Sequence, residues 1–550
     1  MKRHALSTLC LATVLGLTLL GNTPALAAPP PMAPGGQAAS PGAPDNPAAV
    51  GAAASANQGQ PTWAGKPEAA QALPIHYVDC SATIAGDGSA EQPFNALTQI
   101  AGLQLLPGEQ LLFKRGTSCT GTLKFQGSGT AAEPIVVGDF GDAPERATID
   151  AKGAYTVVHL FNQEHIVLKD LAITNAENPG TNRRGITVQL QDYGTGSGYL
   201  LENLDIHDIV GDDAKGPAGS QGIAFQVTGT TVPTTFDGVE LLNNTLTHIN
   251  RQAINIMLST WSCRPEIGCT GTPNWLPATG VVLRGNLLSD IGGDGIVMNT
   301  TEGALVENNT IKGFNLRSAG YNAGLWSFNS NYMLAQFNDT SGGHGTLDGM
   351  AYDIDGGNIG AAFQYNFSHD NDGGFFLLCT HNNIQRDSVV RYNISQNDSF
   401  RGVENCKGPI ESADVYNNTI YIGDGISQTV LNENVDAQRN VKFRNNIVYK
   451  GGTGTVTFKL LANTGYTLEN NVISAWIQGQ PANPGGSTAN PLMCNPGTAQ
   501  GLNSAGGYKL QAASPAIGAG GAIANNGGRD YFGAPVIGTT TVGAAQGAGC

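Results

Sequence analysis

A short phrase that contains one or two asparagines recurs along the chain from about residue 130. It has an apolar pair, one or two asparagines, an alternation of β-branched or apolar residues, and a glycine. The asparagine positions are Asn203, Asn244, Asn286, Asn309, Asn338, Asn366, Asn393, Asn418, Asn446 and Asn471. From Asn286 onward they are 23 to 29 residues apart, and the two earlier gaps are 41 and 42 residues. A period of this length is typical of a solenoid, and the longer gaps leave room for an inserted loop or an extra rung.

The segments between the asparagines predict strands. They are short and rich in β-branched residues, and they lack the 3.6-residue periodicity of a helix. We therefore predict an all-β protein, a single-stranded right-handed parallel β-helix over residues 76–550 with a C-terminal capping segment. Asparagines stacked at one corner can hydrogen-bond along the ladder, and asparagine tolerates the left-handed conformation that a sharp corner needs. The 75 glycines and the low charged fraction of 13% agree with short strands and tight turns.

The first 75 residues are predicted to lie outside this fold. Residues 1–27 have two basic residues, an apolar run and the small-x-small ending Ala25-Leu26-Ala27, which is the pattern of a secretory signal peptide. Residues 28–75 are rich in Ala, Pro and Gly, with almost no large apolar side chain, which predicts a disordered spacer. No other run is long and apolar enough to cross a bilayer. We therefore expect a secreted protein, extracellular or periplasmic, without a membrane anchor.

The first folded residues are predicted to cap the solenoid. A short helix is expected within Phe94–Ile100, followed by a turn at Pro107-Gly108 and a strand over Gln110–Lys114. Such a cap would cover the unpaired backbone and the apolar core of the first rung. A solenoid that is capped in this way needs no partner, so we expect a monomer.

Eight cysteines follow the predicted signal peptide, and an even number in an exported chain suggests disulfide bonds. A sequence does not determine the connectivity, but proximity favours the four pairs Cys80–Cys119, Cys263–Cys269, Cys379–Cys406 and Cys494–Cys550. If all eight are paired, no thiolate is left to act as a nucleophile.

The formal net charge of −15 argues against a nucleic-acid partner. Such a partner requires clustered lysines and arginines, whereas acidic residues outnumber basic ones here by 43 to 28. The excess of acidic residues argues only mildly against a polyanionic glycan, because a local cluster of cations matters more than the net charge of the chain.

Two phrases at the ends of the predicted solenoid resemble those of the pectin-lyase-like superfamily of right-handed parallel β-helices. The opening phrase runs through Tyr77-Val78-Asp79, Leu106-Pro107-Gly108-Glu109 and Phe113-Lys114-Arg115-Gly116. The closing phrase runs from Ser514-Pro515-Ala516-Ile517-Gly518 to Asp530-Tyr531-Phe532-Gly533. The resemblance covers about residues 76–545 and implies the fold of a bacterial carbohydrate-active protein. It does not specify an activity, because many chemistries share this fold.

Aligning successive rungs by the glycine or alanine that opens each strand predicts the outer surface. The outward column of this alignment is Val297, Trp326, Asp353, Phe376 and Glu404. Asp353 and Asp355 then point the same way from one strand, about 7 Å apart at the backbone. Trp326 and Phe328 would lie one rung below them, and Phe376 one rung above. Carboxylates beside exposed aromatic rings suit a sugar, whose glycosidic bond needs acid and base groups and whose C–H face packs on rings.

Other polar residues could complete a site around these two aspartates. Asp372 or Glu404 is the expected catalytic partner if only one of the two aspartates takes part in the reaction. His369 could orient or protonate a group if its turn wraps back beside the pair. The alternatives for the aspartates themselves are a structural calcium site and a solvated surface.

A loop over residues 258–279 occupies one of the longer gaps. It contains Trp261, Trp275 and the proposed Cys263–Cys269 pair, so we expect a pinned loop that overhangs the groove. The two tryptophans could stack on sugars or simply bury the loop.

These residues predict a secreted glycoside hydrolase that acts on a polysaccharide or its fragments. One carboxyl group would donate a proton while another attacks or activates water. The second hypothesis is a calcium-dependent polysaccharide lyase, in which carboxylates hold Ca²⁺ against a uronate and Lys407 or Arg401 is the base. The third is a non-catalytic β-helix that binds carbohydrate or serves as a surface scaffold. No metal site is assigned under the first hypothesis, and Ca²⁺ is a cofactor under the second only.

Overall fold

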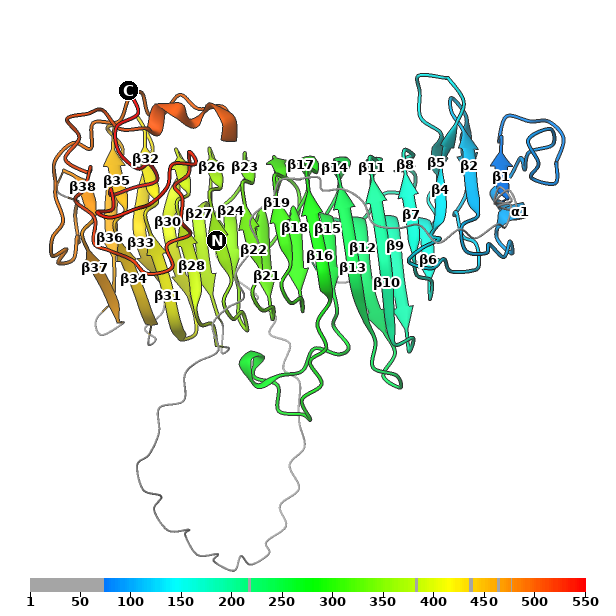
Figure 1. Ribbon diagram of the computed structural model, residues 1–550, viewed down its shortest axis with the longest axis horizontal. Helices are drawn as coiled ribbons and strands as arrows, with labels where there is room; N and C mark the ends of the chain where they lie inside the picture. Colours follow the sequence, from blue (N-terminus) through cyan, green and yellow to red (C-terminus); the bar gives the residue numbers. More distant parts are fainter. Residues whose placement is uncertain (1–73, 216–218, 381–383, 435–438, 462–464, 476) are drawn as a thin grey trace, which may run out of the picture. The chain divides into compact units, whose positions relative to one another are not determined.

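A computed structural model describes residues 74–215, 219–380, 384–434, 439–461, 465–475 and 477–550. The predicted signal peptide (1–27) and almost all of the predicted spacer (28–75) lie outside these residues. The described chain winds into a right-handed parallel β-helix with three sheets, so the predicted fold class is confirmed (Figure 1). Most coils contribute one short strand to each sheet, and every ladder between the named strands is parallel.

The strands of the described chain are named by sheet. Sheet A has 14 strands in the spatial order β1 (Ile75–Val78), β2 (Gln110–Lys114), β4 (Ile135–Phe140), β7 (Ile166–Lys169), β10 (Thr195–Glu202), β13 (Thr235–Leu242), β16 (Thr279–Arg284), β19 (Leu305–Glu307), β22 (Leu334–Gln336), β25 (Ala362–Gln364), β28 (Ser388–Arg391), β31 (Ile410–Tyr416), β34 (Arg439–Arg444) and β37 (Tyr466–Glu469). Sheet B has 13 strands in the order β3 (Ser118–Thr120), β5 (Thr148–Asp150), β8 (Ala172–Asn175), β11 (Asp205–Ile209), β14 (Thr245–Ile249), β17 (Leu287–Ile291), β20 (Thr310–Lys312), β23 (Asp339–Ser341), β26 (Phe367–His369), β29 (Ile394–Gln396), β32 (Thr419–Ile422), β35 (Ile447–Lys450) and β38 (Val472–Ser474). Sheet C has 11 strands in the order β6 (Thr156–Phe161), β9 (Arg184–Gln191), β12 (Gln221–Thr228), β15 (Gln252–Met257), β18 (Ile296–Asn299), β21 (Leu325–Phe328), β24 (Met350–Ile354), β27 (Gly374–Cys379), β30 (Phe400–Cys406), β33 (Gln428–Glu433) and β36 (Val456–Lys459).

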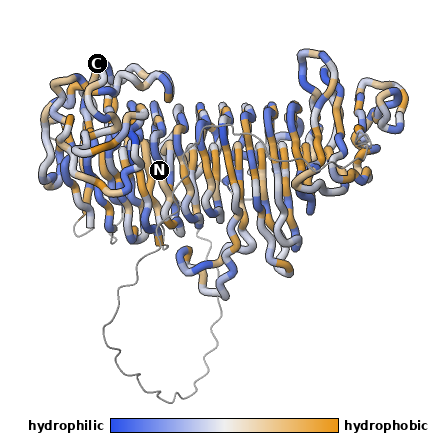
Figure 2. Tube along the Cα trace, in the orientation of Figure 1, coloured by the Kyte–Doolittle hydropathy of each residue, from blue (hydrophilic) through white to orange (hydrophobic). Residues whose placement is uncertain are grey.

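Side chains that alternate along each strand fill the interior of the coil. In sheet C, Ile296 pairs with Leu325, and Leu325 pairs with Tyr352 on the next strand. All three are completely buried in one continuous core. Figure 2 shows hydrophobic positions recurring in the strands from one rung to the next. Because alternate residues of a strand point to opposite faces, the residues between these inward positions form the outer surface of the sheet.

The asparagine ladder lies at the corner between sheets A and B. Its members are Asn244, Asn286, Asn309, Asn338, Asn366, Asn393, Asn418, Asn446, Asn471 and Asn483. Each Nδ2 donates to the Oδ1 of the next member at 2.9–3.1 Å. The predicted hydrogen-bonded stack is therefore confirmed along these rungs.

The left-handed conformation belongs to the residue before the ladder. Asn243 and Asn308 have φ values of 55°, and they precede Asn244 and Asn309. The prediction was wrong for Asn203, which has a φ of 51° and occupies this corner position. The ladder position of that rung is Leu204, whose backbone N–H donates to Asn244 Oδ1 at 3.0 Å. The left-handed backbone conformation and the hydrogen-bonded side-chain stack thus belong to two adjacent residues of each corner.

Both ends of the coil carry added segments. The predicted N-terminal cap is present as helix α1 (Leu97–Ile100), with Leu97 and Ile100 buried in the core, followed by β2 at its predicted bounds. At the other end the chain returns over sheet B as the 3₁₀ helix η2 (Leu502–Tyr508) and the residues that follow it (Figure 1). Its buried residues pack with those of β26 and β29 in a second core cluster.

All four predicted disulfide pairs are present: Cys80–Cys119, Cys263–Cys269, Cys379–Cys406 and Cys494–Cys550. Cys379 and Cys406 are register partners on the adjacent strands β27 and β30. In the part of the chain that the structure describes, no helix has the length and apolar character needed to span a bilayer.

Candidate active site

A cavity of about 390 Å³ opens on the outer face of sheet C, over strands β21 to β30. This volume falls within the range of about 300–1,000 Å³ that is usual for ligand sites. Its lining residues come from several rungs and from loops: Lys215, Tyr321, Trp326, Thr346, Asp348, Asp353, Asp355, Leu377, Cys379, Arg401, Glu404, Cys406, Lys407 and Asn434.

Two aspartates from one segment form part of the cavity wall. Asp353 lies on β24 beside Trp326 of β21 and is 5% exposed. Its Oδ1 is buried and has no hydrogen-bond partner among the described residues. Asp355 follows β24 directly, and its Oδ1 accepts a hydrogen bond of 3.1 Å from the Gly356 N–H. Since both line the cavity and lie two residues apart, one short segment, the end of β24 and the residue after it, presents two carboxyl groups to the same cavity.

Burial raises the pKa values of both carboxyl groups. Burial, followed by the neighbouring Asp355 and Asp348, raises the pKa of Asp353 well above its usual range. Burial raises the pKa of Asp355 to about 7, against a lowering by the Gly356 N–H. Burial also raises the pKa of Asp348 to about 6. Near neutral pH the raised pKa values keep a proton on the pair while a second carboxyl group can ionise, and acid–base catalysis requires one group in each state.

We expect Asp355→Asn to raise the Tm at pH 8 and to leave it nearly unchanged at pH 4. Between the ordinary pKa of 3.8 and about 7 the folded state binds more protons than the unfolded state, so stability falls as the pH rises through this window. At about 1.36 kcal/mol per pKa unit, the full penalty above pH 7 is on the order of 4 kcal/mol, and an amide removes it. Calorimetric scans of both proteins at both pH values measure the effect. An equal change in Tm at the two pH values would contradict it.

Glu404 and Arg401 form a buried ion pair in the cavity wall. Arg401 is 6% exposed and Glu404 4% exposed, and the guanidinium binds Glu404 Oε2 directly. The other Glu404 oxygen accepts a hydrogen bond of 2.7 Å from Asn434. Arg401 also donates to the carbonyl oxygens of Gly373, Thr346 and Asp348. Both charged groups are therefore held in fixed contacts, and they brace the segment that carries Asp348.

Trp326 provides an aromatic wall beside the aspartates. Its Nε1 donates to Asp294 Oδ1 at 3.0 Å, and Asp294 is fully buried. Burial would raise the pKa of Asp294, but the ion pair with Arg251 at 2.7 Å and other favourable contacts lower it. Lys215 Nζ lies 5.7 Å from the centre of the Trp326 ring. The buried Asp294 carboxylate thus fixes the orientation of the Trp326 indole through this hydrogen bond.

The prediction that Phe376 faces outward was wrong. Gly374 pairs with Met350 and Phe376 with Tyr352, so Phe376 is buried in the core and Leu377 takes the outward position. The rung spacing is one residue longer than the alignment by the opening glycine had assumed. A shift of one residue exchanges the two faces of a strand.

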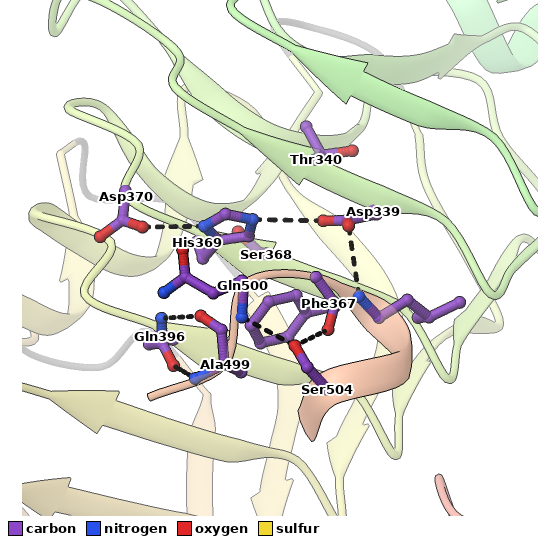
Figure 3. Close-up of polar contacts among 12 residues, drawn as sticks. Asp339, Thr340, Phe367, Ser368, His369, Asp370, Gln396, Ala499, Gln500 and Ser504 are labelled. Carbon is purple, nitrogen blue, oxygen red and sulfur yellow. Dashed lines mark hydrogen bonds and ion pairs between the residues drawn. The ribbon is translucent and has the colours of Figure 1, made fainter. Parts of the chain in front are cut away.

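His369 lies on sheet B, outside the cavity, beneath the C-terminal segment (Figure 3). Its Nδ1 contacts Asp370 Oδ2 at 2.8 Å and its Nε2 contacts Asp339 Oδ1 at 3.4 Å. Burial would lower the pKa of His369, but the ion pairs with Asp339 and Asp370 raise it to about 9. Asp339 also accepts the Leu502 N–H at 3.2 Å. The imidazolium therefore helps to hold the C-terminal segment, and the turn does not bring it to Asp353.

Four other predicted residues also lie outside the cavity lining. Asp372 is exposed, and its Oδ2 accepts the Gly345 N–H at 3.2 Å. Phe328 lies at the end of β21, beyond Trp326. Trp261 packs against the core, and Trp275 Nε1 donates to the Asn329 carbonyl oxygen.

Asp348, Lys215 and Tyr321 also line the cavity and were not predicted from the sequence. Asp348 immediately precedes Gly349, the glycine before β24. This closeness to the strand of Asp353 is a sequence signal that could have identified Asp348. Lys215 and Tyr321 come from corner loops of other rungs, and Lys215 donates to the Tyr321 carbonyl oxygen. No pattern local to Asp353 identifies such distant residues.

The architecture is that of a pectin-lyase-like parallel β-helix. The native structure of the GH136 lacto-N-biosidase from Eubacterium ramulus is similar, with a TM-score of 0.57 and 22% identity over 69% of this chain and 67% of that chain. Its selenomethionine derivative has a TM-score of 0.55 and 21% identity over the same shares. The pectate lyase Pel9A has a TM-score of 0.35 and 15% identity over 87% of this chain and 97% of that chain. At these identities the first likeness shows the fold alone. No family model matches the sequence, and no match was found among the curated proteins.

Proposed function

We propose that the protein is a secreted glycoside hydrolase that acts on a polysaccharide or its fragments. One observation carries the proposal: Asp353 and Asp355 place two carboxyl groups in one cavity, and burial raises the pKa values of both. The tryptophan beside them supplies an apolar ring of the kind that packs on the C–H face of a sugar. The four disulfide bonds are consistent with an oxidising compartment and hence with secretion.

The two aspartates take different roles in this proposal. Asp353 is the more buried and keeps its proton to higher pH, so it donates that proton to the glycosidic oxygen as the bond to the anomeric carbon breaks. Asp355 is hydrogen-bonded by the Gly356 N–H and ionises more readily, so it attacks the anomeric carbon or removes a proton from water. Net reaction adds one water across the glycosidic bond and returns the proton to Asp353.

The lyase hypothesis receives less support from the cavity. Its proposed base Arg401 is committed to Glu404 and to three carbonyl oxygens. Lys407 lines the cavity and is the remaining base for that hypothesis. Within the described ranges, the His, Cys, Asp and Glu side chains form no group of three or more arranged to hold a metal ion. The carboxyl pair therefore suits proton transfer better than a calcium-assisted elimination.

A glycan panel tests the class of reaction. We expect new reducing ends from at least one glycan, with no rise in the ultraviolet absorbance that marks an unsaturated product. The panel contains neutral polysaccharides, uronate polymers, and glycans of the kind a lacto-N-biosidase cleaves, because the Eubacterium ramulus enzyme shares the fold. Unsaturated products that disappear on chelation would favour the lyase. No turnover across the whole panel would favour a binding or scaffold protein.

A further inference from the structure

The connection between β15 and β16, residues 258–278, is called the strap here. It leaves the rung of β15 and contacts the rungs of β21, β24 and β27 along one edge of sheet C. Figure 1 shows it extending from the lower edge of the coil and carrying the 3₁₀ turn η1 (Pro265–Ile267). The Cys263–Cys269 disulfide closes its central loop. None of its residues lines the cavity, so the strap has no direct contact with a ligand bound there.

Arg264 is the central contact of the strap. It is 5% exposed, although it belongs to a loop. Its guanidinium donates to Asn329 Oδ1 at 2.5 Å, to Asn331 Oδ1 at 2.7 Å and to the Gly357 carbonyl oxygen. The Trp275 ring lies 4.3 Å from the guanidinium carbon. The planar guanidinium donates to three acceptors on two rungs, and these hydrogen bonds fix the strap to those rungs.

Further contacts attach the strap on both sides of Arg264. Trp275 Nε1 donates to the Asn329 carbonyl oxygen at 3.0 Å, and Asn329 Nδ2 donates to the Ser262 carbonyl oxygen at 2.8 Å. Glu266 accepts the Ile384 N–H at 2.9 Å through its carbonyl oxygen and pairs with Arg386 at 3.0 Å through its side chain. The strap therefore spans the rungs of β21, β24 and β27.

The strap is fixed against the turn that begins with Asp355. Within this turn, Asn358 Nδ2 donates to the Asp355 carbonyl oxygen at 2.6 Å, and the Gly356 carbonyl oxygen accepts the Asn329 N–H at 2.9 Å. Gly357 has a φ of 77°, and a Cβ built on it would lie 2.4 Å from Ile267 Cγ2. Arg264 thus binds the turn at Gly357, two residues after Asp355, and Ile267 of the strap packs closely against the same glycine.

We infer that Arg264 is a positioning residue for Asp355: through the Gly357 carbonyl oxygen and Asn329 it holds the 355–358 turn, and so the carboxyl group, in place beside Asp353. This inference rests on the proposed hydrolase only in giving Asp355 a catalytic role. The physical coupling between the two residues exists with or without that reaction. The disulfide loop and Trp275 then serve to present the guanidinium, which explains why Trp275 and two cysteines occupy a loop outside the cavity.

A double-substitution cycle tests the coupling without any substrate. The variants are Asp355→Asn, Arg264→Gln and the combination, each scanned for Tm at pH 4 and pH 8. If Arg264 holds Asp355 in its buried position, the Tm gain of Asp355→Asn at pH 8 shrinks to less than half in the Arg264→Gln background, because the loosened turn exposes the carboxyl group to water. The same gain in both backgrounds overturns the inference. Arg386→Ala is the matched control, since it removes another arginine side chain that binds the strap. Arg386 contacts the turn only through its backbone N–H, which alanine keeps, so we expect the full gain there.

The pH–rate profile supplies the second readout once a substrate is known. We expect Arg264→Gln to lower kcat by about 10- to 100-fold with little change in KM, because a small misplacement of a catalytic group has effects of this size. The acidic limb, which follows the ionisation of Asp355, should move to lower pH, and Arg264→Lys should restore part of the loss. Gly357→Ala, which pushes the turn away from Ile267, should act in the same direction. A wild-type profile in Arg264→Gln and Gly357→Ala, with Asp355→Asn inactive, overturns the inference and leaves the hydrolase standing. An active Asp355→Asn variant contradicts the hydrolase, whatever the cycle shows.

Discussion

Asp353→Asn and Asp355→Asn are each expected to lower kcat of the proposed hydrolase by about 10²- to 10⁴-fold. An amide is nearly the same size as a carboxyl group, but it neither donates a proton at neutral pH nor attacks an anomeric carbon. Asp353→Asn removes the buried proton donor, and Asp355→Asn removes the group that ionises at about pH 7. Initial rates on the best glycan of the panel, with KM measured separately, give the effect. Leaving groups that need no protonation should restore activity to Asp353→Asn more than to Asp355→Asn.

The matched control is Glu240→Gln, which changes an exposed side chain on β13 of sheet A that does not line the cavity. It makes the same chemical change on a different face, and we expect wild-type rates. The wild-type rate should follow a bell-shaped pH profile, since one carboxyl group must be protonated and the other ionised. Full activity in both aspartate variants would exclude this pair from the chemistry.

Asn309→Ala is expected to lower the free energy of unfolding by about 3–5 kcal/mol, since each buried group left without a partner costs about 1–3 kcal/mol. Asn309 Oδ1 accepts the N–H and the Nδ2 of Asn286 at 3.0 and 2.9 Å. Its Nδ2 donates to the Leu283 carbonyl oxygen and to Asn338 Oδ1, both at 3.0 Å. Alanine leaves the buried Asn286 N–H without its partner, removes one of the two partners of Asn286 Nδ2 and of Asn338 Oδ1, and interrupts the ladder in mid-coil. Denaturant unfolding followed by circular dichroism measures the loss.

The adjacent Asn308 provides the control for the ladder. It is exposed, with a φ of 55°, and its side chain is not part of the hydrogen-bonded stack. Asn308→Gly keeps the left-handed backbone accessible, so we expect a change within about 0.5 kcal/mol. Equal losses at Asn308 and Asn309 would show that the ladder contributes no more than the corner itself.

The repeat predicts the coil because its signals are local. Each rung repeats the same asparagine corner, and the corner hydrogen bonds join residues one period apart, such as Asn309 and Asn338. The end phrases and the neighbouring cysteines are equally local, and the cap helix and the four disulfides are confirmed where they were expected. The Asp353–Asp355 pair was visible for the same reason, since residues two apart on a strand share a face.

The sequence by itself therefore determined the solenoid, its ladder and the strand that carries two aspartates. Only the tertiary structure decided which side chains surround that strand. A rung one residue longer than assumed turned Phe376 into the core, and a turn between sheets placed His369 under the C-terminal segment. Lys215 and Arg264 reach Trp326 and Gly357 across several rungs. The physical reason is that a period sets only contacts between equivalent positions, whereas a cavity is assembled from loops whose lengths differ from rung to rung.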